Sequence, residues 1–324
     1  MCKASIIIVN WNGIKYLPEC LEAVMRQTFT DFEVIVVDNG STDESVNFIR
    51  DHYQNVRMVC LDENRGFTGG NCVGFEIAKG QFIALLNNDT RVEPTWLESL
   101  VSAMQANPGV GICASKIIID GMALIDSVGD LFTTAFSGTK MGYLHSVDSF
   151  DIPHELHGGC AAAILYRRRM LDEIGFLDDD FFFNHEDTDL NMRAWLNGWK
   201  CEYVPEAIVH HKVSATVGAL SDTSVYYFAR NNVWVWIKNV PSCFILRYLP
   251  QRIVFELSSL AYFCIMKGKW GPFLKGKLDA VKIIPTVLKK RKEVQKLVRL
   301  SRYEIEAGLL PIGKYLRLRL QKIK

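Results

Sequence analysis

The sequence predicts an α/β fold in which a mostly parallel sheet is flanked by helices. Short runs of β-branched residues alternate with stretches of helical spacing through the N-terminal third of the chain. This alternation is typical of parallel β-α-β units with right-handed crossovers. The chain has 324 residues, of which 49% are hydrophobic and 23% charged. It is therefore long enough to bury a substantial core and far from the composition of a disordered protein.

The expected elements follow in order along the chain. They are strands at 4–12, 32–45 (ending in a turn), 56–62 and 81–89, helices at 14–27 and 186–198, a glycine-rich loop leading into a helix at 64–80, and a strand followed by a helix at 160–175. Gly198 closes the second of these helices, and beyond Pro241 the chain is expected to be helical and basic. In open parallel sheets, ligands bind beyond the carboxyl ends of the strands. Asp38, Asn64 and Asp89 all fall at such ends.

The charges are unevenly divided along the chain. The net charge is only +1, yet residues 240–324 contain 19 Lys and Arg against 5 Asp and Glu, which leaves 18 basic and 31 acidic residues in 1–239. Such a split suggests that the C-terminal region faces an anionic surface. Residues 289–324 interleave Leu, Ile and Val with Lys and Arg, which predicts either a basic amphipathic helix on a membrane or a charged face packed on the body. The longest clean apolar run, 257–266, is too short to span a bilayer of ~30 Å.

The cysteines and the N-terminus indicate a compartment. Nine cysteines are scattered and contain no C-x-x-C pair, which argues against a zinc site or a disulfide framework and favours a reducing compartment. The N-terminus offers one Lys and the short apolar run 6–9, so we expect no signal peptide. The basic tail has no aromatic-rich groove, so nucleic acid is not an expected partner.

Two acidic residues at strand ends each have two interpretations. Asp38 follows a buried strand and is either a turn former or an acceptor for the ring N–H of a uracil or thymine base. Asp89 ends the run "FIALLNND" (82–89) and either caps the next helix or binds a metal ion. A divalent ion that bridges two phosphates needs few protein ligands. The pair His210-His211 offers a second ligand, since imidazole beside a carboxylate is accepted at manganese-type and magnesium-type sites.

The segment "NHEDTDLNMRAW" (184–195) places three acids at the start of an expected helix. Glu186 and Asp189 share one helix face, whereas Asp187 points elsewhere. Acids in a first turn complement the helix dipole, but a carboxylate at a helix start facing a cleft also suits a general base for an acceptor hydroxyl. The stretch "NRGFTGGN" (64–71) is either a structural turn or an anion-binding loop, and its spacing matches neither G-x-G-x-x-G nor G-K-[ST].

Seven segments, taken together and in order, closely resemble glycosyltransferase family 2. They are "IIIVNWNG" (6–13), "VIVVDNGSTDES" (34–45), "ENRGFTGGN" (63–71), "ALLNNDT" (84–90), "FFFNHEDTDLNMRAWLNGW" (181–199), "VHHKVSAT" (209–216) and "YYFARNN" (226–232). Within the family they look most like the bacterial rhamnosyltransferase-like branch, and the match covers roughly residues 4–240. The resemblance implies a GT-A fold, a single Rossmann-like α/β nucleotide-sugar domain, and inverting, usually metal-dependent transfer from a nucleoside diphosphate sugar.

For the donor, the resemblance implies that Asp38 reads the pyrimidine base and that Asn10 lies near the nucleoside. Arg230, in the pair that follows "YYFA", is expected to contact a phosphate. The other donor-binding positions that the motifs imply are Asn64, Gly66, Asn71, Asn87 and Asn88. The expected donor is a dTDP- or UDP-type sugar, with rhamnose suggested by analogy to the branch alone.

For catalysis, the resemblance implies that Asp187, beside Glu186, is the base that takes the proton of the acceptor hydroxyl. The triplet 87–89 stands in the place of the family's D-x-D, with Asn at its first position. Asp89 therefore remains as the expected metal ligand, and His211 completes a site for Mg²⁺ or Mn²⁺.

The resemblance divides the chain into three parts. Residues 1–115 would hold the nucleotide sugar, 116–239 the acceptor and the base, and 240–324 would associate with an anionic membrane. We expect a cytoplasmic protein, peripheral on the inner face of the cell membrane, that glycosylates a lipid-linked saccharide in cell-surface polysaccharide assembly. Two rival functions remain open: a nucleotidyltransferase that makes nucleotide sugars, although 10–19 lacks the basic glycine-rich loop that it would need, and an inactive transferase-like protein that tethers partners at the membrane.

Overall fold

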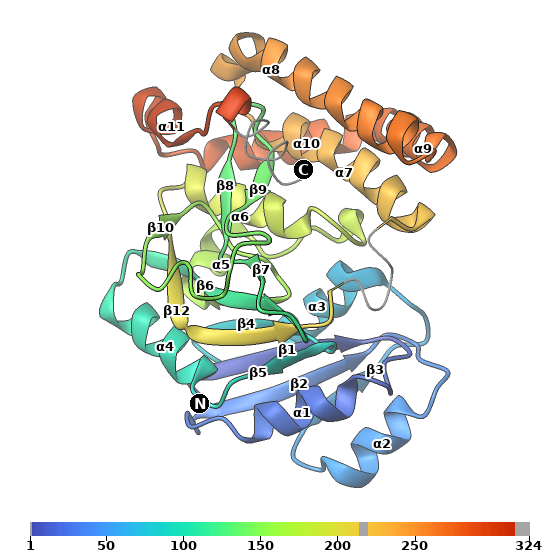
Figure 1. Cartoon of the computed structure of the whole chain (residues 1–324), viewed down its shortest axis with the longest axis vertical. Helices are drawn as coiled ribbons and strands as arrows, with labels where there is room; N and C mark the ends of the chain where they lie inside the picture. Colours follow the sequence, from blue (N-terminus) through green and yellow to red (C-terminus); the bar gives the residue numbers. More distant parts are fainter. Residues whose placement is uncertain (1, 214–219, 315–324) are drawn as a thin grey trace.

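The computed structural model of this chain describes residues 2–213 and 220–314. A ten-stranded sheet with its flanking helices forms the lower part of the molecule in Figure 1, and helices of the C-terminal region form a layer above it. The predicted α/β fold class and the helical C-terminal region are confirmed. The end of the motif at 209–216 and the expected basic tail beyond residue 314 lie outside the described residues.

The sheet is parallel in its N-terminal half and mixed beyond it. Its strands, in chain order, are β1 (Ala4–Asn10), β2 (Phe32–Asp38), β3 (Arg57–Cys60), β4 (Phe82–Asn87), β5 (Thr90–Val92), β6 (Val110–Ile119), β7 (Ile125–Ser127), β10 (Glu155–Leu156), β11 (Ala163–Arg167) and β12 (Lys200–His211); β8 (Asp130–Phe132) and β9 (Gly138–Lys140) form a separate hairpin. In the order β3-β2-β1-β4 all neighbours are parallel, as predicted. β11 then runs antiparallel to β4 and to β6, and β12 pairs with β6 in parallel.

Helices cover both faces of the sheet. They are α1 (Leu17–Met25), α2 (Ser45–His52), α3 (Gly66–Ile77), α4 (Trp96–Ala106), α5 (Arg168–Ile174), the 3₁₀ turn η1 (Asp179–Phe181), α6 (Glu186–Leu196), α7 (Asp222–Asn239), α8 (Ser242–Leu260), the π-helical turn η2 (Ala261–Met266), α9 (Trp270–Lys282), α10 (Ile284–Lys296) and α11 (Arg302–Gly308). Ile6 and Ile8 pack under α1 and α4, whereas Ile7 faces α3 and α5. Because successive strand residues point to opposite faces and both faces are covered, Ile6, Ile7 and Ile8 are all fully buried.

The glycine-rich stretch is mostly a helix packed on a strand. α3 begins at Gly66, so the loop covers less of 64–80 than the sequence predicts. A Cβ on Gly70 would lie 2.7 Å from Val9 Cγ1, and a Cβ on Gly74 would lie 2.5 Å from Ile7 Cγ2. Carbon atoms do not approach so closely, so these glycines let α3 lie directly on β1. This packing outweighs the low helix propensity of glycine.

The basic C-terminal segment is two helices and not one continuous helix. The chain leaves α10 and starts again at α11, which Ser301 caps. α10 packs on the body: Lys290 Nζ lies 2.7 Å from Asp180 Oδ2, and Arg291 Nη1 donates to the backbone oxygen of Ile237 (2.6 Å). The prediction of one amphipathic helix over 289–324 was therefore wrong for its described part. No helix among the described residues is both long and apolar enough to cross a bilayer.

A buried ion cluster joins α6 to α7. Asp189 is fully buried, and its carboxylate accepts hydrogen bonds from Arg193 Nε (3.0 Å), Lys238 Nζ (2.9 Å) and Asn239 Nδ2 (2.8 Å). Burial alone would raise the pKa of Asp189, but Lys238 and Arg193 outweigh it and keep the pKa below its usual value. This acid of the 184–195 cluster therefore holds two helices together.

Gly74→Ala should lower the free energy of unfolding by about 1–3 kcal/mol, because the new methyl group must displace Ile7 or shift α3. Gly313→Ala is the matched control, since Gly313 is also helical, is not followed by proline, and a Cβ there would have no atom within 4 Å. The control should be neutral or slightly stabilising because alanine is the better helix former. Urea unfolding measures both. Equal stability of the two variants would contradict the close packing of α3 on β1.

Candidate active site

Three polar side chains from the carboxyl ends of β1, β2 and β4 form one buried chain of hydrogen bonds. Asn88 Nδ2 donates to Asn10 Oδ1 (2.8 Å), and Asn10 Nδ2 donates to Asp38 Oδ1 (3.1 Å). Asp38 Oδ2 accepts the backbone N–H of Ser41 (3.0 Å). All three side chains are almost completely buried. The structure thus brings these predicted residues together, with Asn10 as the link between Asn88 and Asp38.

The end of β12 places His211 beside Asp89. β12 pairs with β5 so that His211 lies opposite Thr90, and the N–H of Lys212 donates to the backbone oxygen of Asp89 (3.1 Å). His211 Nε2 then lies 3.3 Å from Asp89 Oδ1, and both side chains are buried. Asp89 Oδ1 accepts no hydrogen bond of normal geometry from the described residues. A buried carboxylate oxygen without a donor, next to an imidazole nitrogen, is a plausible pair of ligands for a cation.

Asp126 on β7 holds the other side of the His211 ring. Its Oδ2 lies 3.6 Å from His211 Nδ1, and its two oxygens lie 2.8 and 2.9 Å from Lys140 Nζ. Burial alone would raise the pKa of Asp126, but Lys140 and His211 outweigh burial and lower the pKa to about 2. Burial opposes a charged imidazole, yet the close carboxylates of Asp126 and Asp89 raise the pKa of His211 to about 9.

Glu186 and Asp187 form a coupled pair at the start of α6. Asp187 is partly exposed, and its carboxylate accepts the N–H groups of Ala161 (3.3 Å) and Thr188 (2.6 Å). Burial raises the pKa of Asp187, and these N–H groups offset part of the rise. Glu186 is buried, one of its oxygens has no partner, and burial together with the charge of Asp187 raises its pKa to about 8. Within the pair, burial and the neighbouring charge therefore favour the protonated form of Glu186.

Lys140 connects this pair electrostatically with the Asp89–His211 pair. Its side chain is 40% exposed, its ammonium group is paired with Asp126, and its charge also lowers the pKa of Asp187. Asp130 lies in the same field: burial, followed by the negative charge of Asp187, raises the pKa of Asp130 to about 7. Carboxylates from β7, β8 and α6 are thus all stabilised by the charge of Lys140. In the described ranges, no group of three His, Cys, Asp or Glu side chains is arranged to bind a metal by itself.

The loop that leads into α6 has a strained backbone. Phe182, Asn184 and His185 have positive φ angles of 62°, 71° and 69°. Residues other than glycine adopt such angles at a cost of order 1–3 kcal/mol each, and they persist only where the surroundings hold them. Strain of this kind is concentrated at functional sites, and here it directly precedes Glu186.

Two side chains of α7 hold this loop in place. Asn231 Nδ2 lies 2.6–3.0 Å from three backbone oxygens of residues 181–184. Arg230 Nη2 donates to the backbone oxygens of Asp180 and Phe181 (2.8 Å each), the second of which Asn231 also binds, and its guanidinium lies over the Trp234 ring. The phosphate contact predicted for Arg230 stays a prediction. What the structure adds is a positioning role for Arg230 and Asn231.

The predicted residues of α3 lie on the other side of the same loop. Asn64 Oδ1 accepts the N–H of Gly66 (2.8 Å), and Asn71 donates to a backbone oxygen of its own helix. Gly66 has a φ of +74°, and a Cβ there would lie 2.3 Å from the backbone oxygen of Phe182. Only glycine therefore allows α3 to begin so close to the loop that precedes Glu186.

Two other residues of the predicted motifs flank the Asp89–His211 pair. His210 Nε2 lies 3.0 Å from Glu93 Oε1, so the first histidine of the His210-His211 pair is engaged elsewhere. The backbone oxygen of Asn87 accepts the hydroxyl of Thr90 (2.6 Å), which turns the chain from β4 into β5. Asn87 thus contributes to the turn that carries Asp89.

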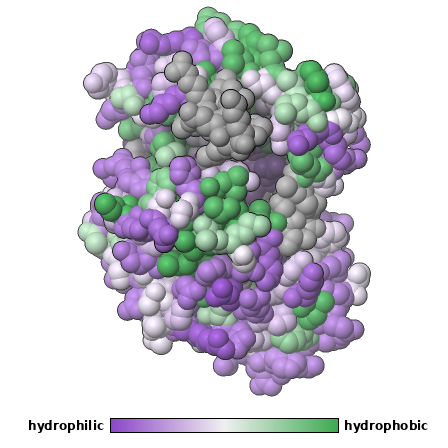
Figure 2. Space-filling view, in the orientation of Figure 1, coloured by the Kyte–Doolittle hydropathy of each residue, from purple (hydrophilic) through white to green (hydrophobic). Residues whose placement is uncertain are grey.

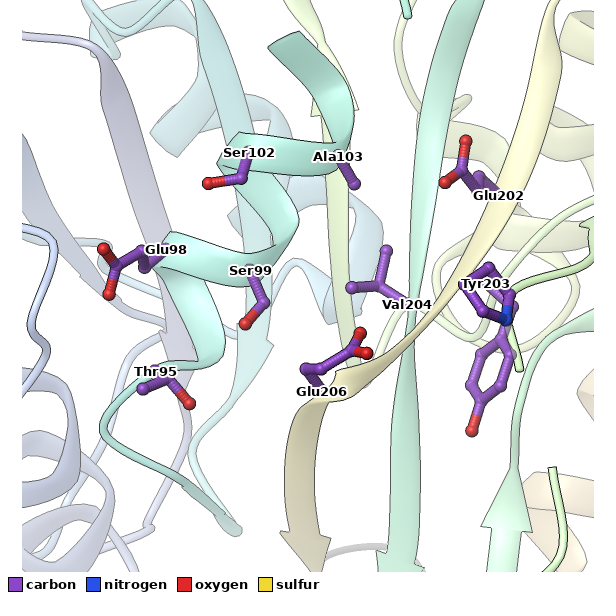
Figure 3. Close-up of a pocket in the computed structure, with 10 residues that line it drawn as sticks. Thr95, Glu98, Ser99, Ser102, Ala103, Glu202, Tyr203, Val204 and Glu206 are labelled. Carbon is purple, nitrogen blue, oxygen red and sulfur yellow. The ribbon is translucent and has the colours of Figure 1, made fainter. Parts of the chain in front are cut away.

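A surface hollow of about 490 Å³ lies between α4 and β12 (Figure 3). Glu98 lies on the α4 side and Glu202 and Glu206 lie on β12. None of the residues predicted from the sequence lines this hollow. The candidate site is therefore the cluster at the strand ends and not this depression.

The sequence motifs missed Asp126, Asp130 and Lys140. These residues lie on the short strands β7, β8 and β9, of three residues each, within the stretch whose periodicity is irregular. The spacing of Asp126 and Asp130 is a weak signal, since acids four residues apart are common in solvated loops. Only the pairing of β7 with β6 brings Asp126 to the end of β12.

Comparison with known proteins identifies the family of this chain. The profile of the family described as Glycosyl transferase family 2 matches residues 5–175. A glycosyltransferase of Nostoc sp., alr2836, is 33% identical over 122 residues (37% of this chain, 38% of that protein), and a glucosyl-dolichyl phosphate glucuronosyltransferase of Haloferax volcanii is 28% identical over 126 residues (37% and 40%). EpsH of Bacillus subtilis is 25% identical over 223 residues (64% and 60%). The chain thus spans two fifths to three fifths of the length of these relatives.

Solved structures share the fold. GalNAc-T7, crystallised with UDP, GalNAc and Mn²⁺, has a TM-score of 0.61 at 18% identity, over 87% of this chain and 55% of that protein. TarS 1-349 of S. aureus in complex with UDP-GlcNAc has a TM-score of 0.57 at 19% identity, over 90% and 88%. At these identities the likeness concerns the fold alone.

Asn231→Ala should loosen the loop before α6, because it removes the side-chain donor from the partly buried backbone oxygens of Phe183 and Asn184. The expected loss of stability is about 1–3 kcal/mol, with faster hydrogen exchange of the backbone amides at 181–190. Asn232→Ala is the matched control: Asn232 is the adjacent buried asparagine, and its side-chain oxygen has no hydrogen-bond partner. If both variants changed the hydrogen-exchange rates at 181–190 equally, Asn231 would not be the residue that holds this loop in place.

Proposed function

The chain belongs to glycosyltransferase family 2, and we propose that it is an inverting glycosyltransferase that moves a sugar from a nucleoside diphosphate to a hydroxyl of a saccharide acceptor. One observation carries the proposal: Lys140 connects two pairs of side chains electrostatically. Asp89 and His211 form a pair of the kind that binds a cation. Glu186 and Asp187 form an acid pair with raised pKa values. A leaving diphosphate and a nucleophilic hydroxyl need such a combination, because one gains negative charge while the other loses a proton.

The residues present suit a divalent metal held together with a diphosphate. Asp89 Oδ1 is buried without a hydrogen-bond donor and lies 3.3 Å from His211 Nε2. Asp126 faces the other nitrogen of the ring, as carboxylates commonly do behind metal-binding histidines. Two protein ligands are enough where phosphate oxygens and water complete the coordination. Bound there, Mg²⁺ or Mn²⁺ would stabilise the charge of the departing diphosphate.

Asp187 is our choice for the base. It is the more exposed member of the acid pair, whereas Glu186 is buried and has a pKa raised to about 8. In the proposed reaction Asp187 accepts the proton of the acceptor hydroxyl, the oxygen attacks the anomeric carbon in line, and the bond to the diphosphate breaks with inversion. The N–H groups of Ala161 and Thr188 orient the carboxylate, and the clamp from α7 fixes the loop that carries it.

The donor and acceptor halves follow from the motifs. We propose that residues 1–115 bind the nucleotide sugar, with Asp38 reading a pyrimidine base of the dTDP or UDP type, and that 116–239 bind the acceptor. A lipid-linked saccharide is the proposed acceptor. The Haloferax relative is named as a glucosyl-dolichyl phosphate glucuronosyltransferase, an enzyme with an acceptor of this class. Rhamnose as the sugar, a role in cell-surface polysaccharide assembly and a cytoplasmic, peripheral position on the membrane are proposals that rest on the resemblance in sequence.

A donor panel tests the proposal directly. The protein is incubated with thymidine, uridine and guanosine diphosphate sugars, with Mg²⁺, Mn²⁺ or a chelator, and release of the nucleotide is measured. We expect metal-dependent release from a thymidine or uridine donor. An inactive tethering protein would release nothing from any donor, and a nucleotidyltransferase would instead consume a nucleoside triphosphate and a sugar phosphate.

Asp89→Ala and Asp187→Asn should each reduce transfer by at least about 100-fold, because they remove a ligand of the diphosphate-bound cation and the base, respectively. Both variants should unfold at nearly the wild-type urea concentration. Asp51→Asn, an exposed acid on α2, is the control and should keep full activity. An Asp187→Asn enzyme with wild-type turnover would remove Asp187 from the role of base.

Glu186→Gln should separate the two acids by their pH dependence. The pKa of Glu186 is about 8, so it is protonated at neutral pH, and glutamine mimics that form. The variant should keep the acid limb of the kcat/KM profile, which reports ionisation of Asp187, and lose the change in rate near pH 8. A loss of about 100-fold at every pH would instead identify Glu186 as the base.

A further inference from the structure

More than half of the large hydrophobic side chains that the described residues expose lie in one helical hairpin, α8–η2–α9. Six of them are at least 60% exposed: Leu246, Leu257, Ile265, Met266, Leu278 and Val281. Figure 2 shows hydrophobic surface at the top of the molecule, where Figure 1 places α8. We call the outer side of this hairpin, marked by these six residues, the α8–α9 face. Apolar side chains gathered in this way mark an interaction surface.

Core packing does not explain the α8–α9 face, because the hairpin has a separate inner side. On α8, Phe244, Tyr248 and Phe255 are buried against the body at helical spacing, whereas Leu246 and Leu257 point away from it. α9 likewise packs through Gly276, whose Cβ position lies 2.4 Å from the backbone oxygen of Tyr226 on α7. Each helix is therefore apolar on two sides, and the described residues cover only one of them.

The charges around the α8–α9 face have one sign. The exposed charged residues of 242–282 are Arg247, Lys267, Lys275 and Lys282, and all are basic. The two acids of this range are partly buried, and each forms an ion pair with a lysine. An apolar strip fringed with lysines suits an anionic lipid surface, where the side chains enter the interface and the ammonium groups meet phosphates. A second copy of the same face would bring like charges together.

We propose that the α8–α9 face docks on an anionic lipid bilayer. The hairpin lies in the interface and does not span it, in keeping with the lack of a membrane-crossing helix among the described residues. Trp270, 48% exposed at the start of α9, belongs to a residue type that is enriched at membrane–water interfaces. The membrane contact is thus made by α8 and α9 and not by α10, whose Lys290 and Arg291 are engaged with the body.

Docking on this face gives the active site a fixed relation to the membrane. α9 rests on α7, and α7 holds the loop before Glu186 through Arg230 and Asn231. This last step rests on the proposed function: an enzyme that glycosylates a lipid-linked saccharide would receive its acceptor from the surface on which the hairpin lies. The docking itself requires no transfer activity.

The test is sedimentation of the full-length protein with vesicles of phosphatidylcholine, with and without phosphatidylglycerol. We expect binding that needs the anionic lipid and weakens as salt is added. The double variant Leu257→Glu/Leu278→Glu should reduce binding by at least about tenfold, because it puts two carboxylates into the contact. The matched control is Met122→Glu/Ile152→Glu, which makes the same change at two exposed apolar residues elsewhere (56% and 77% exposed) and should bind as wild type does.

Three outcomes would overturn the proposal. One is a wild-type protein that ignores anionic vesicles at low salt, and another is equal weakening by both double variants. The third is a wild-type dimer in sedimentation equilibrium that Leu257→Glu/Leu278→Glu dissociates without any effect of lipid, which would make the face a protein interface. Donor hydrolysis without vesicles is measured in parallel and should be retained by Leu257→Glu/Leu278→Glu. Intact vesicle binding without hydrolysis by any form would count against the proposed function alone.

Discussion

The whole arrangement depends on the compensation of buried charge by cations from distant segments. A carboxylate taken out of water costs several kcal/mol unless a partner restores the interaction, and this chain places Asp89, Asp126, Asp187 and Asp189 inside the fold or at its inner edge. His211 and Lys140 serve the first three, and Arg193 with Lys238 serves the fourth.

α7 contacts both the region of the acid pair and the exposed hairpin. Its Lys238 and Asn239 bind Asp189 of α6, and its Arg230 and Asn231 hold the strained loop before Glu186. The opposite side of α7 carries α9, and with it the exposed hairpin (Figure 1). One helix therefore fixes the position of the acid pair relative to the surface that we assign to the membrane. Because buried hydrogen bonds and close packing make this connection, it leaves little freedom for the two regions to move independently.

The motifs predicted much of this site because local chemistry determines it. A β-branched run followed by a polar residue places Asn10, Asp38 and Asp89 at strand ends whatever the rest of the chain does. The structure brings the strand-end residues together and sets His211 beside Asp89. Three other features could not be predicted, because they depend on contacts between segments that are far apart in the sequence. Arg230 binds backbone oxygens, Gly70 and Gly74 let a helix pack on β1, and the basic tail breaks into two helices on the body.

The α/β class, the position of the strand ends and the acids that lie at them can be predicted from the sequence, since hydrophobic periodicity and residue type are local properties. Which charges neutralise one another depends on how the strands and helices pack. Asp126 and Lys140 enter the site because β7 pairs with β6, whose neighbour β12 ends at His211. The tertiary structure also decides which side of α8 and α9 remains uncovered, because that depends on what else packs against the hairpin. Strand pairing and helix packing join residues far apart in the chain, so no window of sequence contains them.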